Sequence, residues 1–283
     1  KPAGMTSHDV ISRLRRIFRT RRVGHAGTLD PMATGVLVVG IERGTRFLAH
    51  LVTETKTYRA TIRLGASTTT DDAEGDITSR TDTTDVTDTL INAAITQLTG
   101  DIMQKPAAVS AIKIDGKRAH ERVRDGETVD IPARPVTVHR FDVLDRRSVD
   151  GYIDLDVDVF CSSGTYIRSL ARDLGNALGV GGHLTELRRT TVGPFDLTHA
   201  RTLEELEDNP QLSLTLDQAL AASFPVLRVS GEEGHKLAMG QWLEPRGLKG
   251  IHAAVTPDGK AVALVKEKGK RLATVFVARP STL

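Results

Sequence analysis

The sequence predicts an α+β protein, in which a mixed and largely antiparallel sheet is followed by a small β-rich unit. Some segments carry apolar residues at helical spacing and others at every second position, and these segments do not alternate as in a doubly wound fold. A length of 283 residues suffices for one large domain with a small appendage. The shares of hydrophobic residues (39%) and charged residues (26%) are those of an ordinary soluble globular protein.

The first predicted element is an amphipathic helix over residues 7–19. Thr6 and Asp9 have the spacing of a capping box at its start. The apolar stripe of this helix consists of Val10, Ile11, Leu14, Ile17 and Phe18. Four arginines fall largely off the stripe, namely Arg13, Arg15, Arg16 and Arg19. They form either a solvated helix surface or a face that contacts phosphates.

Two strands and a second helix are predicted next. Residues 33–41 indicate a buried strand, and residues 56–64 alternate like a half-buried strand, with Tyr58 on the apolar face. The threonine- and aspartate-rich residues 67–88 indicate a long exposed connection. Residues 89–99 have helical spacing and end at Gly100. The inward side chains of this helix are expected to be Leu90, Ile91, Ala94, Ile95 and Leu98.

An extended, partly mobile insertion is predicted over residues 105–135, where no clean period exists. A strand follows over residues 153–161, with Cys161 in its apolar set, which favours a core thiol over a catalytic one. A helix is then predicted over residues 166–178.

The smaller C-terminal unit is expected to span residues 224–283, which leaves residues 1–223 as the main domain. Ser230 and Glu233 have capping-box spacing, and Gly240 ends the short helix that follows. Residues 261–266 and 271–278 indicate two strands joined by a turn.

The net charge of +2 hides a segregation of charge along the chain. Basic groups prevail in residues 1–24 (seven against one acid), 105–124 (six against two) and 224–283 (ten against five), whereas residues 67–90 hold seven acids and one base. An anionic partner responds to local charge rather than to the sum. Each block alone could be a solvated surface, but three basic blocks together favour a nucleic-acid partner.

Composition and spacing argue against several classes of site. The single cysteine cannot form a disulfide framework, which favours a reducing, cytoplasmic compartment. No apolar run approaches the roughly 18 residues of a membrane span. The nine histidines lack zinc-ligand spacing, and no Walker loop or dinucleotide fingerprint occurs, so we expect neither a metal nor a cofactor. The few aromatic residues are dispersed, which argues against a stacking platform of the RRM or OB type.

One segment combines features of a reactive loop. Residues 24–35, GHAGTLDPMATG, hold three glycines, Pro31 and the lone acid Asp30 between a basic helix and a predicted buried strand. The proline disfavours helix at Asp30 and fixes the chain next to it. The carboxylate of Asp30 could act as a nucleophile or base, or it could bond local amides in an Asx turn. Local pattern alone does not decide between these roles.

The same segment resembles the catalytic motif of the TruB family of tRNA pseudouridine synthases, and the resemblance extends over most of the chain. The other matching segments are KPAGMTS at residues 1–7, KTY at 56–58, TDDAEG at 70–75, CSSGTYIR at 161–168 and LRR at 187–189. In this family a strand precedes the KPxG segment, so residues upstream of Lys1 are expected.

The resemblance implies a pseudouridine synthase fold with a C-terminal PUA-like, RNA-binding domain. It further implies a monomeric, cytoplasmic enzyme that needs no metal or cofactor and isomerises uridine 55 in the T stem-loop of tRNA. Asp30 aligns with the catalytic aspartate, which could attack C1′, attack C6 or promote elimination. Arg168 aligns with the arginine that pairs with this aspartate, and Tyr58 with the tyrosine that packs on the target base.

The resemblance also implies a set of substrate-binding residues. Because a uridine inside a folded loop is unreachable, the base has to be flipped out. The residues that align with positions around the flipped nucleotide are His25, Tyr166, Leu187, Asp72, Lys1 and Arg46. The family usually has lysine at the last of these positions. The insertion over residues 105–135 resembles the segment that clamps the RNA stem-loop.

Two other functions remain open at this point. A non-catalytic RNA-binding or tRNA-folding factor would use the same surface without a nucleophile. A carboxylate glycosidase acting on free nucleosides would need two acids, but the motif holds only one. The joint presence of Asp30, Arg168 and Tyr58 favours the synthase.

Overall fold

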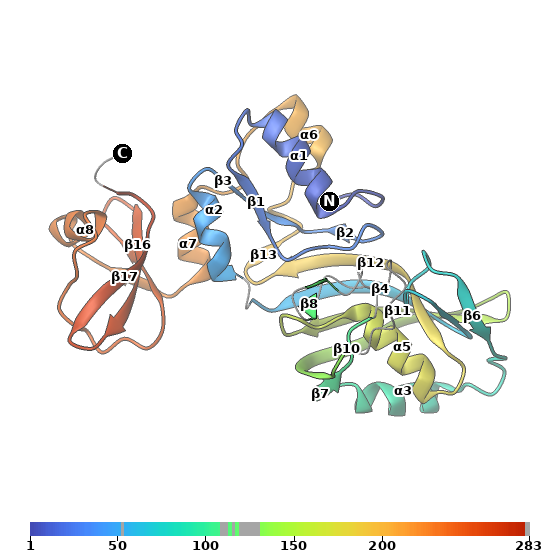
Figure 1. Ribbon diagram of the computed structural model, residues 1–283. Helices are drawn as coiled ribbons and strands as arrows, with labels where there is room; N and C mark the ends of the chain where they lie inside the picture. Colours follow the sequence, from blue (N-terminus) through green and yellow to red (C-terminus); the bar gives the residue numbers. More distant parts are fainter. Residues whose placement is uncertain (52–53, 108–112, 115–116, 119–130, 281–283) are drawn as a thin grey trace.

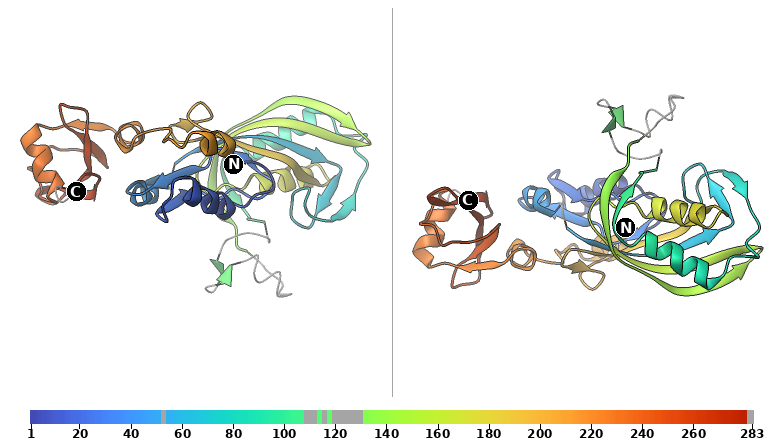
Figure 2. Two further views of the ribbon diagram at one scale, coloured as in Figure 1. Left: turned by 90° about the horizontal axis from the view of Figure 1, so that it is seen from above. Right: turned by 90° about the horizontal axis from the view of Figure 1, so that it is seen from below.

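The computed structural model describes residues 1–51, 54–107, 113–114, 117–118 and 131–280, and the molecule is elongated (Figures 1 and 2). A large body holds the N-terminal and central parts of the chain. A smaller C-terminal unit lies at one end, next to the helix α7 (Leu216–Ser223). The predicted α+β class is confirmed.

A mixed sheet runs through the large body, and seven strands of the described residues take part in it. Six of them follow the order β13-β12-β4-β11-β10-β7, and all their pairs are antiparallel. Their bounds are β13 (Phe195–Asp196), β12 (Gly182–Val192), β4 (Lys56–Leu64), β11 (Tyr152–Cys161), β10 (Arg134–Val149) and β7 (Gly100–Gln104). The seventh, β2 (Thr34–Gly35), pairs in parallel with β12.

Helices α3 (Asp88–Gln97) and α5 (Ile167–Ala177) cover one face of this sheet (Figure 1). Alternation on β4 and β11 turns Ile62 and Leu155 toward these helices, where they pack with Leu170 in the main core. The other face is polar, and ion pairs such as Arg63–Asp154 join the same two strands there. The predicted strands over 56–64 and 153–161 and the helix over 166–178 are confirmed. Cys161 is fully buried in the core, and burial raises the pKa of its thiol to about 11.

A smaller N-terminal layer packs above the sheet (Figure 1). It contains α1 (Ser7–Ile17), β1 (Val23–Ala26), β3 (Val38–Ile41), α2 (Gly44–Phe47), the 3-10 helix η1 (Leu48–Leu51) and α6 (Leu203–Asp208). The capping box predicted for α1 is present, because Thr6 and Asp9 each accept from the other's backbone N–H. The arginine-rich side of α1 is partly paired, since Arg13 bonds Glu207 near the end of α6.

Three sequence predictions need correction. The single buried strand over residues 33–41 is wrong, because the chain turns at Gly35, so that β2 joins β12 while β3 pairs with β1. The connection over 67–88 is not wholly exposed, because Thr68, Asp72, Thr83 and Val86 are buried. It also contains a hairpin of β5 (Ala66–Thr68) and β6 (Ile77–Arg80). Leu90 does not face inward and is exposed, because the side of α3 that meets the core is centred on Ile91 and Ile95, which leaves Leu90 at its edge.

The predicted insertion over residues 105–135 lies largely outside the described residues. Two short described strands, β8 (Lys113–Ile114) and β9 (Lys117–Arg118), pair with each other and stand away from the sheet in Figure 2. The last part of the predicted insertion belongs to β10, which begins at Arg134. The pattern missed this strand because about half its length is exposed on both sides.

The C-terminal unit is a four-stranded sheet with one helix against it. Its elements are β14 (Val226–Arg228), α8 (Gly231–Ala238), β15 (His252–Val255), β16 (Ala261–Lys268) and β17 (Arg271–Val277). The capping box at Ser230 and the two joined strands are confirmed. Leu220 of α7 packs with Phe47 and Leu264, so one apolar cluster links this unit to the large body. No helix in the described part of the chain has the length and apolar character to cross a membrane.

Candidate active site

The loop that carries Asp30 is fixed from the side of α1. The buried hydroxyl of Ser7 accepts a hydrogen bond from the N–H of Leu29 (2.9 Å) and donates one to its carbonyl (3.1 Å). Leu29 itself is buried in the main core. The N–H of Ala33 donates to the carbonyl of Asp30 (2.9 Å), which closes a turn around Pro31. Asp30 is therefore held by both its neighbours and is not a mobile surface acid.

The side chain of Lys1 contacts the backbone of the same loop and is not ion-paired with the Asp30 carboxylate. Its Nζ donates to the carbonyls of Pro31 (3.1 Å) and Ala33 (2.7 Å), and the N–H of Gly4 also donates to Pro31 (2.8 Å). Burial lowers the pKa of the Lys1 ammonium, and the nearby charge of Asp30 opposes this shift. The predicted basic residue is thus beside the site, with its donors on the backbone.

Asp30 forms an ion pair with Arg168, as the sequence predicted. The distance between Oδ2 of Asp30 and Nε of Arg168 is 3.0 Å. The two side chains differ in accessibility, since that of Asp30 is 36% exposed and that of Arg168 only 7%. Arg168 lies in the first turn of α5 and is buried. One edge of the carboxylate is thereby held, while the other remains open to a ligand.

A second carboxylate lies behind Arg168. Its Nη1 is 3.9 Å from Oδ2 of Asp72 and donates to the carbonyl of Thr70 (3.1 Å). Asp72 is buried, and its Oδ1 accepts from the Thr70 hydroxyl (2.6 Å) and the N–H of Glu74 (3.0 Å). Asp72 was predicted to bind substrate, but its oxygens are engaged inside the acidic loop and beside the arginine. Its position is that of a residue that orients Arg168.

Arg189 is a buried cation that joins the Asp30 loop to the sheet. It is only 1% exposed, and it donates from Nη2 to the carbonyl of Gly27 and from Nε to that of Val36, both at 2.9 Å. These two carbonyls lie on either side of Asp30 in the chain. Among the described residues, no carboxylate is ion-paired with Arg189. The planar guanidinium thus bonds both ends of the loop, and no carboxylate of the described residues neutralises its charge.

Gly35 permits this attachment. Its φ of +107° is unfavourable for other residues, and a Cβ there would lie 2.1 Å from the Arg189 carbonyl oxygen. The close approach lets β2 pair with β12, and the N–H of Val36 donates to the Arg189 carbonyl (2.8 Å). The last glycine of the motif is therefore required by backbone contact with the sheet.

Tyr58 lies on β4 next to this cation. It is buried in the main core, and burial raises the pKa of its hydroxyl. The charge of Arg189 acts in the opposite direction and lowers this pKa. The same charge adds to burial in lowering the pKa of Lys56 and that of His25. The charge of Arg189 thus acts on three neighbouring titratable groups of the site.

Four predicted site residues remain, of which Tyr166 and Leu187 lie on or next to elements of the main sheet and its helices. Tyr166 precedes α5, its backbone is held by the buried amide of Gln104 (2.8 and 3.1 Å), and the charges of Arg168 and Asp30 affect its pKa, which burial raises. Leu187 lies on β12 opposite Ala60, in the same core as Tyr58.

Arg46 does not join this cluster. It is exposed on α2, and the described contacts place it with Arg22 and Arg43 rather than with Asp30. His25 is half-buried on β1, and its closest charges are Arg189 and His8.

Arg189 and Gln104 were missed as site residues in the sequence. A signal for Arg189 was present, because Leu187 and Arg189 are two positions apart on one strand and therefore share a face. An arginine on an inward strand face needs partners, and here two backbone carbonyls supply them. Gln104 gave no such signal, since its role depends on a contact with a residue 62 positions away.

Three family models together match most of the chain. "TruB family pseudouridylate synthase (N terminal domain)" matches residues 15–167, "tRNA pseudouridylate synthase B C-terminal domain" residues 168–222, and "tRNA Pseudouridine synthase II, C terminal" residues 224–279. The chain belongs to the TruB family of pseudouridylate synthases. The family that its motifs resemble is thereby confirmed.

Full-length relatives of this TruB protein are named "tRNA pseudouridine synthase B". That of Corynebacterium efficiens is 74% identical, with 100% of this chain and 95% of the relative covered. That of Nocardia farcinica is 59% identical, with 100% and 92% covered.

Two solved structures share the fold. One is an H/ACA RNP bound to a substrate RNA containing 2′-deoxyuridine (TM-score 0.73, 26% identity, 99% of this chain and 83% of that chain). The other is a Cbf5-Nop10-Gar1 complex (TM-score 0.74, 27% identity, 100% and 84%). Among the residues that the structure describes, no group of three or more histidine, cysteine or acidic side chains could hold a metal ion.

Replacement of Arg189 by lysine tests the clamp on the Asp30 loop. The lysine keeps a charge but cannot span the carbonyls of Gly27 and Val36, so one of them loses its partner. We expect the free energy of unfolding to fall by about 1–3 kcal/mol and kcat for pseudouridine formation to fall more than KM changes. Urea unfolding and steady-state kinetics measure these quantities.

The matched control is Arg188→Lys. Arg188 is the neighbouring residue but is exposed, and its Nη1 donates only to the Thr34 hydroxyl (3.2 Å). Equal effects of the two substitutions would contradict a special role for Arg189.

Proposed function

We propose that this chain converts uridine 55 in the T loop of tRNA to pseudouridine. The observation that carries the proposal is the 3.0 Å ion pair between Arg168 and the loop aspartate Asp30, within a chain of the TruB family. The pair comes from segments 138 positions apart, so only the folded chain creates it. The names of the full-length relatives support tRNA as the substrate.

The reaction is an isomerisation within one nucleotide. The bond between N1 and C1′ breaks, the uracil turns, and a bond between C5 and C1′ forms. C5 loses a proton and N1 gains one, so that no oxidant or reductant is consumed. The protein has to supply a group that reacts with the nucleotide, a pocket that retains the detached base, and a route for one proton.

Asp30 is the reacting group in this proposal. Its carboxylate is partly exposed, while the turn at Pro31 and the Ser7 contacts fix its backbone. Arg168 supplies the positive charge that an anionic carboxylate needs at the edge of a core. Asp72 and the Thr70 carbonyl hold the same guanidinium from behind. Preorganisation of this kind avoids reorientation during the reaction.

Tyr58 and Arg189 handle the proton that leaves C5. A neutral phenol cannot accept a proton, so in this proposal Tyr58 gives its own proton to N1 of the detached base and then, as the phenolate, takes the proton that leaves C5. Burial disfavours that anion, and the charge of Arg189 stabilises it. Tyr58 also forms a wall of the uracil pocket with Leu187 and Tyr166, into which the flipped base enters. His25, half-buried on β1, helps to hold the extruded region of the RNA in this proposal.

The basic segments hold the RNA. The arginines of α1 other than Arg13, which is paired with Glu207, form phosphate contacts on the N-terminal layer together with Arg46. Lys1 contributes by holding the Asp30 loop through its carbonyls. The insertion over 105–135 clamps the T stem-loop. The catalytic domain spans residues 1–223, and the PUA-like RNA-binding domain spans residues 224–283. The enzyme acts as a monomer in the cytoplasm.

Substitution of Asp30 by asparagine tests the catalytic assignment. The amide keeps the size of the side chain but lacks the charge and the nucleophilic oxygen. We expect pseudouridine formation in unmodified tRNA to fall by at least about 100-fold, while the Kd for tRNA stays within a few-fold. The control is Asp76→Asn, which removes the same charge from an exposed position. Wild-type turnover in Asp30→Asn would exclude this aspartate as the reacting group.

The salt dependence of binding tests the basic surface. Each phosphate contact releases counterions, so affinity falls steeply as salt rises. We expect the affinity for tRNA to fall at least about tenfold between 50 and 200 mM monovalent salt, as measured by filter binding. A flat dependence would mean that the basic segments are not the contact surface.

A further inference from the structure

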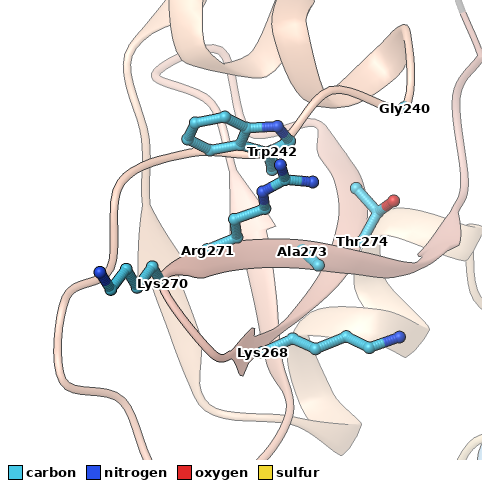
Figure 3. A pocket seen from close by; sticks show the side chains of 7 residues that line it. All are labelled: Gly240, Trp242, Lys268, Lys270, Arg271, Ala273 and Thr274. Atoms are coloured by element: carbon cyan, nitrogen blue, oxygen red, sulfur yellow. The ribbon is translucent and has the colours of Figure 1, made fainter.

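A pocket of about 500 Å³ opens on the C-terminal unit, far along the chain from Asp30. It lies where the hairpin of β16 and β17 meets the segment that follows α8 (Figure 3). Its lining residues are Gly240, Trp242, Lys268, Lys270, Arg271, Ala273 and Thr274. Its volume is within the range of small-ligand sites, roughly 300–1,000 Å³.

An aromatic ring is presented in this pocket by a fixed backbone. Trp242 is the only tryptophan of the chain and is 45% exposed. The next residue, Leu243, is buried and forms two backbone hydrogen bonds with Leu272 of β17 (3.0 and 2.8 Å). The guanidinium of Arg271 lies 4.8 Å from the ring centroid and next to the indole in Figure 3. The ring is therefore held in place although much of its surface is free.

Three cations of the hairpin gather at the same pocket. Lys268 and Arg271 are paired across the two strands, and Lys270 lies in the two-residue turn between them. None of the three is ion-paired with a carboxylate of the described residues. The neighbouring acid, Glu267, instead accepts from the backbone N–H groups of Arg246 and Leu248 (2.8 and 3.2 Å). The positive charge at the pocket is thus uncompensated.

Three other cations of this unit are paired: Arg246 with Glu233, Arg279 with Asp217, and Lys260 with Asp258 (3.5 Å). The remaining cations of the unit, Arg228, Lys236, Lys249 and Lys266, have no carboxylate partner among the described residues. What distinguishes the pocket is therefore that three such cations line it together with an exposed aromatic ring. An aromatic ring flanked by unpaired cations is the arrangement that binds unpaired nucleotides, where bases stack and phosphates meet positive charge.

We propose that this pocket binds an unpaired nucleotide of the RNA substrate, outside the T stem-loop. The base stacks on Trp242 beside the Arg271 guanidinium, and the flanking phosphates contact Lys268 and Lys270. The proposal rests on tRNA being the substrate, and it adds a second contact that the chemistry at Asp30 does not need. A paired base could not enter, because its faces are already stacked in the duplex.

The sole tryptophan makes this pocket directly observable. Its fluorescence is to be followed while a single-stranded oligoribonucleotide is added to the full chain, and while inorganic polyphosphate is added in parallel. We expect quenching by the oligonucleotide, because a stacked base contacts the indole, and little change with polyphosphate. Equal responses to both would overturn the stacking claim and indicate a plain anion site. No response to the oligonucleotide would overturn the proposal.

The cations are tested in a variant that keeps the tryptophan. Lys268→Ser with Lys270→Ser is expected to weaken oligonucleotide binding about tenfold and to reduce its salt dependence. The control is Arg228→Ser with Lys249→Ser, which removes the same charge from two exposed residues that do not line the pocket and have no carboxylate partner among the described residues. Equal weakening in both double variants would contradict a localised site.

Kinetics then separate this proposal from the proposed function. Trp242→Ala is expected to raise KM for whole tRNA by about 5- to 150-fold, the range of one stacked base, and to leave the kinetics on an isolated T stem-loop unchanged. An unchanged KM for whole tRNA would overturn the pocket while leaving the function intact. Absence of pseudouridine in both RNAs with the unsubstituted chain would instead refute the proposed function.

Discussion

The site depends on one buried guanidinium. Arg189 donates to carbonyls before and after Asp30, its charge acts on the pKa of Tyr58, and it has no carboxylate partner among the described residues. Burial of a charge without a carboxylate partner is costly. The hydrogen bonds that Arg189 donates to the Asp30 loop account for its position in spite of this cost. Through Arg189 the sheet sets the position of the loop, and the loop presents Asp30 to Arg168. The ion pair between Asp30 and Arg168 is therefore a consequence of how β2, β12 and β4 meet.

Much of the fold could be predicted from local pattern, because periodicity reports which side of an element is buried. The helices α1 and α5 and the strands β4 and β11 are such cases. The pattern failed where a contact distant in sequence decided the structure. Gly35 ends a predicted strand because its backbone meets Arg189, and β10 was missed because half of it has no buried face.

The candidate site was predictable through its motifs and only partly through physics. Local pattern left Asp30 between a reactive acid and an Asx turn, and the ion pair with Arg168 favours the former. The geometry changes the roles expected for two other residues. Asp72 is buried next to Arg168, and Lys1 bonds backbone carbonyls of the Asp30 loop. Arg189 belongs to the LRR segment but was not assigned to the site, because its role depends on carbonyl partners more than 150 positions away in the chain.

The central claim is that this architecture isomerises uridine 55 of tRNA. The most direct measurement is to incubate the chain with unmodified tRNA and to map pseudouridine along the RNA by chemical labelling. The account predicts a single strong signal at the T-loop uridine. Tight tRNA binding without any pseudouridine there would contradict it and would favour an RNA-binding role for the same surface.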